Sequence, residues 1–205
     1  MVNNIFFIWD YMKREFERSI REAKELISRI NDSAHSFAHA ESVVKFTLEI
    51  ADGYPEVDRE LIEVAAWWHD IGRLYAEEHE KLSAEMAQKS LEKLGVEKEI
   101  CRKVYDAIVF HKWSMHPKTL EGEIIRDADK LDFISIERWK KCLASQNLSV
   151  LEEISNLLPR LRNELLHLEI SKKIYDRMIQ EFKGFVVGNE DLDFLRIKNG
   201  LSSDY

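Results

Sequence analysis

The sequence has few of the residues that interrupt helices or cross-link small domains. Its 205 residues include seven glycines and three prolines, where average usage would give about 25 of the two together. Two cysteines are too few for a disulfide scaffold or an all-cysteine zinc ribbon. No apolar run approaches the roughly 18 residues that a membrane span requires. These absences argue against a sandwich, a barrel and a membrane protein, and we expect a cytoplasmic location.

Positive charge is also scarce relative to negative charge. Thirty Lys and Arg residues face 38 Asp and Glu residues, which gives a formal net charge of −8 at pH 7. A broad nucleic-acid-binding surface is therefore not expected, although a small basic pocket is compatible with this balance. Charged residues make up 33% of the chain and hydrophobic residues 45%, which together with the scarcity of breakers favours long amphipathic helices.

Apolar residues recur at helical spacing along most of the chain, and no alternating strand pattern persists. The fold class predicted is all-α, a compact helical bundle, within a single domain of residues 1–205. We expect a motif-bearing core over about 33–140, C-terminal helices over about 150–183 and a loose tail over 188–205. The individual helices are predicted over about 4–29, 33–51, 58–72, 81–94, 98–110, 120–139, 150–168 and 170–182.

Histidine is concentrated in one part of the sequence. Six of the seven histidines lie between His35 and His116. Imidazole is a ligand for divalent transition ions, and carboxylate suits the harder members of that series. The adjacent pair His69-Asp70 is informative, because neighbouring helix residues point about 100° apart and share an ion only near a helix end. Gly72 marks such an end.

A second concentration of charge lies at residues 127–132, where three acids stand among apolar residues. Asp129 and Asp132 are three residues apart and share a helix face. Burying Asp127, Asp129 and Asp132 is costly unless a cation, an arginine or a lysine neutralises them. A metal ion held by the histidines and these acids would meet that need.

The ordered pattern His39, His69-Asp70 and Asp129 resembles the HD superfamily of metal-dependent phosphohydrolases. Further segments resemble the motifs of this family in the same order, and together they span about residues 33–140. They are AHSFAH at 34–39, WHDIGR at 68–73, His79 with the Ser-Ala-Glu of 83–85, AIVFH at 107–111 and IRDADKLD at 125–132.

The resemblance implies one divalent ion, Mn, Fe, Co, Ni, Zn or Mg, held by His39, His69, Asp70 and Asp129. It also implies roles for residues around that ion. The side chains that fall where some members bind a second ion or touch the phosphate are His79, His111 and His116. Arg73 and Lys130 stand where a cation would hold a substrate phosphate, and Asp132 where a carboxylate would orient a ligand or a water. The expected catalytic set is Asp70, His111, Arg73, Lys130 and Asp132.

The function expected from this resemblance is hydrolysis of a phosphate ester or phosphoanhydride in a small molecule, with a nucleotide as the first candidate. Two alternatives remain open. One is a di-iron oxygenase of the HD type, which needs a full second ligand set. The other is a module that binds a nucleotide without turnover. A small phosphorylated partner fits the phosphohydrolase and the nucleotide-binding module but not the oxygenase. A homodimer is also compatible with the sequence.

Overall fold

The computed structural model describes residues 2–30, 32, 34–76, 78–112 and 114–193, and it describes side chains from Asp10 onward. No strand occurs among these residues, so the predicted all-α class is confirmed. The long helices are α1 (Val2–Ile27), α2 (Phe37–Ala51), α3 (Arg59–Trp68), α4 (Glu80–Lys93), α5 (Lys98–Ile108), α6 (Leu120–Leu131), α7 (Ile136–Ala144), α8 (Leu148–Arg160) and α9 (Glu169–Val187). Short turns of helix are η1 (Ile71–Leu74), η2 (Asp132–Ile134), η3 (Leu161–Leu165) and η4 (Glu190–Leu192).

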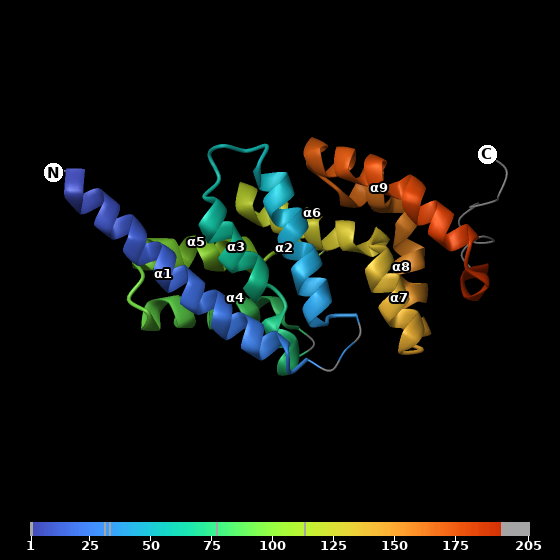
Figure 1. Cartoon of the computed structure of the whole chain (residues 1–205), viewed down its shortest axis with the longest axis horizontal. Helices are drawn as coiled ribbons and strands as arrows, with labels where there is room; N and C mark the ends of the chain where they lie inside the picture. Colours follow the sequence, from blue (N-terminus) through green and yellow to red (C-terminus); the bar gives the residue numbers. More distant parts are fainter. Residues whose placement is uncertain (1, 31, 33, 77, 113, 194–205) are drawn as a thin grey trace.

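The helices form two groups joined by a central pair, α2 and α6 (Figure 1). Helices α1, α3, α4 and α5 pack together at the N-terminal end, and α7, α8 and α9 lie at the other end. Helix α2 packs against α3 of the first group and against α6. Helix α6 in turn packs against α9 of the second group. The core contains large side chains that are almost fully buried, among them Trp68, Trp139 and Phe182. No helix in the described part of the chain combines the length and the apolar character needed to cross a bilayer.

Side-chain caps determine where several helices begin. The carboxylate of Asp58 accepts the backbone N–H groups of Glu60 and Leu61 at 3.0 Å each, which satisfies two donors at the start of α3. The hydroxyl of Thr119 likewise accepts the N–H of Gly122 at the start of α6. Helix α2 begins at Phe37 and not near residue 33, because Ser36 has extended backbone. Ser33 itself lies outside the described residues.

Two helices that the sequence predicted as continuous are interrupted at chemically important positions. The predicted helix 58–72 ends at Trp68 and resumes as the tighter turn η1. Gly72 approaches its neighbours so closely there that an added Cβ would lie 2.5 Å from the carbonyl oxygen of His79. The predicted helix 120–139 breaks into α6, η2 and α7, because Ser135 has extended backbone. His69, Asp70 and Asp132 therefore all lie at helix ends.

The remaining predicted boundaries are close to the observed ones, with one further interruption. The predicted helix 150–168 is divided into α8 and η3, which follows Pro159. Part of the predicted tail, Glu190–Leu192, forms the short turn η4, and residues 194–205 lie outside the described part.

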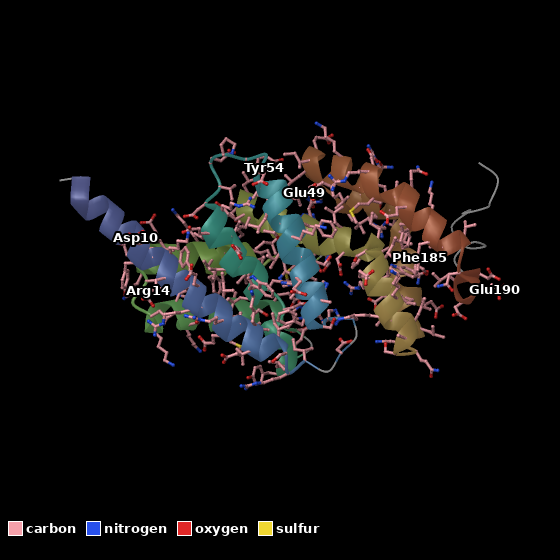
Figure 2. The ribbon with its side chains drawn as sticks, viewed as in Figure 1. Asp10, Arg14, Glu49, Tyr54, Phe185 and Glu190 are labelled. Carbon is pink, nitrogen blue, oxygen red and sulfur yellow. The ribbon has the colours of Figure 1, made fainter. Side chains whose placement is uncertain are left out.

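The C-terminal helices are fixed to the central pair by polar contacts. The carboxylate of Asp127 in α6 accepts the backbone N–H groups of His167 and Leu168, which directly precede α9. Figure 2 shows Glu49 near the end of α2, and its carboxylate pairs with Arg177 of α9 at 2.7 Å. These contacts hold α9 beside α2 and α6, the two helices that carry His39 and Asp129.

Candidate metal centre

Three side chains from different positions converge to form a first group of ligand atoms. His39 comes from α2, and His69 and Asp70 follow the end of α3; their ligand atoms lie within 4.8 Å of one another. The Nε2 atom of His39 lies 3.5 Å from Asp70 Oδ2 and 3.5 Å from Oδ1 of Asp129. Donor atoms bonded to one ion at about 2.0–2.1 Å lie roughly 3–3.5 Å apart, so this spacing suits a transition ion.

A second group shares Asp70 with the first. The Oδ1 atom of Asp70 lies 2.7 Å from Nε2 of His79 and 3.5 Å from Nε2 of His111. The other oxygen of Asp70, Oδ2, lies 3.7 Å from Nε2 of His69. The carboxylate of Asp70 thus presents one oxygen to each group. All five side chains of the two groups are buried.

Hydrogen bonds at Nδ1 orient the imidazole rings. The Nδ1 atoms of His69 and His111 lie 2.7 Å from the carbonyl oxygens of Ala66 and Ile108. A carbonyl oxygen only accepts, so each Nδ1 donates and leaves Nε2 with the lone pair in the neutral ring. His39 is held similarly, with Nδ1 2.7 Å from Oδ2 of Asp132.

Two of these Nε2 atoms are buried polar atoms that lack a hydrogen-bond partner. Nε2 of His39 and Nε2 of His69 have no hydrogen-bond partner among the described residues. Buried polar atoms are almost always paired, so an unpaired set of this kind needs a physical explanation. A divalent ion bound by His39, His69 and ionised carboxylates explains it, and the donor set of imidazole and carboxylate suits such an ion.

The two histidines of the first group, His39 and His69, have pKa values shifted in opposite directions. Burial lowers the pKa of His69 to about 4, so its ring is neutral near pH 7. Burial and Arg138 also act to lower the pKa of His39, but the carboxylates of Asp132 and Asp70 outweigh them and raise that pKa to about 9. Without an ion, His39 therefore carries a proton that a metal must displace.

The carboxylates of the centre are ionised. Burial acts to raise the pKa of Asp70, yet His69, which is protonated at the low pH where Asp70 titrates, and Arg73 hold that pKa well below its usual range. Burial is likewise overcome at Asp129, where Lys130 lowers the pKa of the carboxyl group. Ionised carboxylates at buried positions supply the negative charge that a dication requires.

Cationic side chains surround the centre, and each is paired with a carboxylate. The Nε atom of Arg73 lies 3.0 Å from Asp70 Oδ2. The other pairs are Lys130 with Asp129, Arg138 with Asp132 at 2.8 Å, and Lys112 with Glu80 at 3.4 Å. Positive charge therefore stands next to the ionised carboxylates around the two ligand groups.

A cavity of about 260 Å³ opens beside the two groups. Asp70 lies behind its wall, since that wall includes His79 and His111. The full lining is His35, Arg73, His79, Glu80, His111, Lys112, Asp129, Lys130, Phe133, Arg138, Val150, Glu153, Ile154 and Leu157. Part of this wall comes from α8, which lies outside the motifs that the sequence singled out.

The structure brings most of the sequence-predicted site residues together. His39, His69, Asp70 and Asp129 adjoin one another, and the side chains that contact them are Arg73, His79, His111, Lys130 and Asp132. His116 is different, because it is exposed and belongs neither to the two groups nor to the cavity lining of the described residues.

Asp127 departs from the prediction for the acidic cluster. It was expected to need a cation, an arginine or a lysine, but backbone N–H groups of His167 and Leu168 stabilise its carboxylate instead. The sequence alone could not show this, because these donors lie about forty residues downstream.

Sequence reasoning also missed several residues around the centre. Arg138 is buried, and its Nη1 atom lies 2.8 Å from Asp132 Oδ2 and 3.1 Å from His39 Nδ1. Arg138 follows Glu137 and precedes Trp139 and two lysines, so the sequence did not mark it as buried. Glu80 and Lys112 gave no signal either, because only the fold places them at the cavity.

Comparisons with known proteins agree with this arrangement. Residues 36–134 match the family model of the HD domain. The chain is similar to a predicted HD superfamily hydrolase from an uncultured Thermotogales bacterium, with 26% identity over 85% of this chain and 89% of that chain and a TM-score of 0.61. It is also similar to YpgQ of Bacillus subtilis, solved in complex with ADP, with 16% identity over 88% of this chain and 97% of that chain and a TM-score of 0.64. At 16% identity this second likeness shows the fold alone. The comparison with curated protein sequences gave no match.

Proposed function

The chain is an HD-domain protein, and from this premise we propose that it is a metal-dependent phosphohydrolase that acts on a small phosphorylated molecule. The observation that carries the proposal is the pair of ligand groups that share Asp70, beside a cavity lined with cationic side chains. The similarity to an HD superfamily hydrolase supports hydrolysis, and the ADP bound to YpgQ supports a nucleotide as the substrate.

In this proposal His39, His69, Asp70 and Asp129 hold the first divalent ion. Their atoms adjoin one another, and the unsatisfied Nε2 atoms of both histidines fit this role. When bound, the ion lowers the pKa of a water and polarises a phosphoryl oxygen. Asp132 fixes the ring of His39 through Nδ1 and thereby orients a ligand, as the resemblance implied.

The cations beside the ligands would bind the phosphate. Arg73 contacts Asp70 through Nε, which leaves its terminal amino groups available for phosphate oxygens. Lys130, paired with Asp129, adds positive charge on the same wall. Both side chains offset the charge that develops on the phosphoryl oxygens in the transition state.

His111 is the proposed proton carrier. Its Nδ1 donates to Ile108, so its Nε2 is the atom that accepts a proton and returns it to the leaving oxygen. Nε2 also lies 3.5 Å from Asp70, within the second ligand group. A second ion held by Asp70, His79 and His111 is the competing use of the same atom.

The test is a panel of phosphate esters and anhydrides assayed on metal-stripped protein reloaded separately with Mn, Fe, Co, Ni, Mg or Zn. Release of phosphate or pyrophosphate that depends on the ion, and that Asp70→Ala abolishes, supports the proposal. Asp52→Ala is the matched control, because Asp52 forms an exposed pair with Arg59 away from the centre. Tight binding of a nucleotide without turnover of any ester would favour a binding module instead.

A di-iron oxygenase is the second candidate. The shared carboxylate of Asp70 favours it, since one oxygen faces each ligand group in the way that a bridging ligand does. The cations in the cavity lining favour the phosphohydrolase, because cationic side chains match the charge of a phosphate. Two equivalents of iron with visible absorption, and oxygen uptake in place of phosphate release, would favour the oxygenase.

A further inference from the structure

The cavity beside the metal centre has two chemically different walls. One wall carries the four cations of the lining, Arg73, Lys112, Lys130 and Arg138, together with His35, His79, Glu80, His111, Asp129 and Phe133. The rest of the lining comes from one helix, α8, and consists of Val150, Glu153, Ile154 and Leu157. No cation comes from α8 among these described lining residues. A phosphate is therefore attracted to the first wall, and the rest of a substrate is left to face α8.

The α8 residues form a regular stripe. Positions 150, 153, 154 and 157 stand in an i, i+3, i+4, i+7 relation, so they share one face of the helix. Ile154 is buried, Val150 and Leu157 are half-buried, and Glu153 is exposed. The stripe thus offers apolar surface with one acidic acceptor at its exposed margin.

We propose that this stripe of α8 is the subsite for the organic leaving group of the substrate, with Leu157 and Ile154 packing on its apolar face and Glu153 accepting a hydrogen bond from it. The inference rests on the proposed phosphohydrolase function and goes further by assigning what selects the substrate. The chemical class that fits is a phosphorylated compound whose organic group has both an apolar face and a hydroxyl or amino donor.

The size of the cavity limits that organic group. Its volume of about 260 Å³ lies just under the range of roughly 300–1,000 Å³ that is usual for drug-sized ligands. The compact cavity fits a single phosphorylated unit and excludes a chain of nucleotides. Helix α8 also lies beyond residues 36–134, so this selectivity comes from a part of the chain outside the matched HD domain.

The experiment compares two esters that share a phosphate and differ in the leaving group. Adenosine 5′-monophosphate carries a flat base and ribose hydroxyls, whereas methyl phosphate carries neither. Loss of three carbon atoms in Leu157→Ala should lower kcat/KM for adenosine 5′-monophosphate roughly 5- to 30-fold and leave methyl phosphate within twofold. Glu153→Gln keeps the shape but weakens the acceptor, and a loss of about three- to tenfold is expected for the nucleotide alone.

Matched controls lie on other faces of the same helix. Leu148 is 54% exposed and outside the cavity lining, so Leu148→Ala should change neither substrate. Glu152 is exposed and also absent from the lining, which makes Glu152→Gln the control for Glu153→Gln. Equal losses on both esters, or no loss on the nucleotide, would overturn the assignment of the stripe. Ile154→Val, a smaller change at the buried position, keeps the test available if Leu157→Ala disturbs folding.

Binding measurements separate this inference from the proposed function. If the metal-loaded wild type hydrolyses neither of these two esters nor any other ester or anhydride of the panel, the phosphohydrolase proposal fails. The α8 subsite is then decided by calorimetry with adenosine 5′-monophosphate and inorganic phosphate. Weaker nucleotide binding by Leu157→Ala with unchanged phosphate binding supports the subsite. Equal binding by the variant and the wild type, or no nucleotide binding by either, refutes it.

Discussion

The Nδ1 atom of His39 lies 2.7 Å from Oδ2 of Asp132, a residue 93 positions later in the sequence. Arg138 donates to the same carboxylate oxygen at 2.8 Å, so His39, Asp132 and Arg138 form one buried network. The network joins α2 to η2 and α7, and it fixes the direction in which Nε2 of His39 points. The break of the helix at Asp132 is thus linked to the orientation of a candidate metal ligand.

The first prediction concerns this network. Asp132→Asn removes the charge that orients and polarises His39, and we expect the affinity for the first ion to fall about 10- to 100-fold. Competition with a chromophoric chelator measures the change. Asp106→Asn is the control, because Asp106 forms a partly exposed helix pair with Arg102. Unchanged metal affinity in Asp132→Asn would mean that Arg138 and packing alone hold the ring.

The second prediction concerns the shared carboxylate. Asp70→Ala removes a ligand from both groups at once, so we expect metal content to fall to background by elemental analysis. Arg73 also loses its partner, which adds to the loss of stability. Metal content equal to that of the wild type would refute the assignment of Asp70 to either group.

The third prediction concerns the attachment of the C-terminal helices. Asp127 accepts backbone N–H groups of His167 and Leu168 next to the positive end of α9. Asp127→Ala leaves these donors unsatisfied, and we expect a loss of about 2–4 kcal/mol in the free energy of unfolding. Chemical denaturation measures it, with Asp176→Ala as the control because its pair with Arg162 is exposed and contributes little to stability.

The metal binding of Asp127→Ala distinguishes a docking role from a site role. Since the ligand groups do not include Asp127, the folded variant should bind the first ion with wild-type affinity. A variant that stays fully stable but loses metal would contradict the structural role and return Asp127 to the acidic cluster that the sequence suggested.

The sequence was sufficient for the helical class and for the candidate ligand residues that the fold brings together, because both follow from local patterns. His39, His69-Asp70 and Asp129 stand in recognisable motifs, and helical periodicity is visible within a few turns. The breaks after Trp68 and at Asp132 were missed because apolar residues continue at helical spacing through both segments. Tertiary contacts, such as the close approach of Gly72 to His79, override that local preference.

The contribution of α8 was beyond the sequence for a different reason. An apolar stripe at 150, 154 and 157 predicts only that this face is covered, and it does not say by what. The fold decides that this stripe, which packs on the core, also borders the cavity. Arg138 was also beyond the sequence, since its neighbours Glu137 and Lys140 do not mark it as buried and its pairing with Asp132 follows from the geometry of η2.

The fourth prediction concerns pH. The pKa of His39 lies at about 9 without an ion, above its ordinary value of 6.5, so metal must displace a proton below pH 9. The apparent affinity should therefore rise about tenfold per pH unit up to roughly pH 9. The sign for the metal-free protein is opposite. A raised pKa contributes stability that is complete below pH 6.5 and lost as the pH rises through 9.

Calorimetry in buffers of different ionisation enthalpy measures the protons released on metal binding. We expect at least one proton near pH 7, and His69 should add none because its pKa of about 4 keeps it neutral there. Metal affinity that is flat between pH 6.5 and 9 would show that His39 is already neutral in the metal-free protein.

The fifth prediction concerns His111, whose Nε2 atom is 3.5 Å from Asp70 and whose ring is buried beside His69 and His79. His111 is not in the first ligand group, so His111→Ala should keep one ion. Loss of the proton carrier should lower kcat about 10²- to 10⁴-fold on the best phosphoester. His116→Ala is the matched control, since His116 is exposed and outside the cavity lining, and it should keep full activity.

Metal stoichiometry then decides how His111 acts. A proton carrier leaves the number of bound ions the same in His111→Ala and in the wild type, and we expect this result. A fall from two ions to one would assign His111 to a second metal with Asp70 and His79, since that group would lose a ligand. An unchanged rate together with an unchanged stoichiometry would contradict both roles. The buried ring would then serve packing, and the chemistry would rest with the first ligand group and its cations.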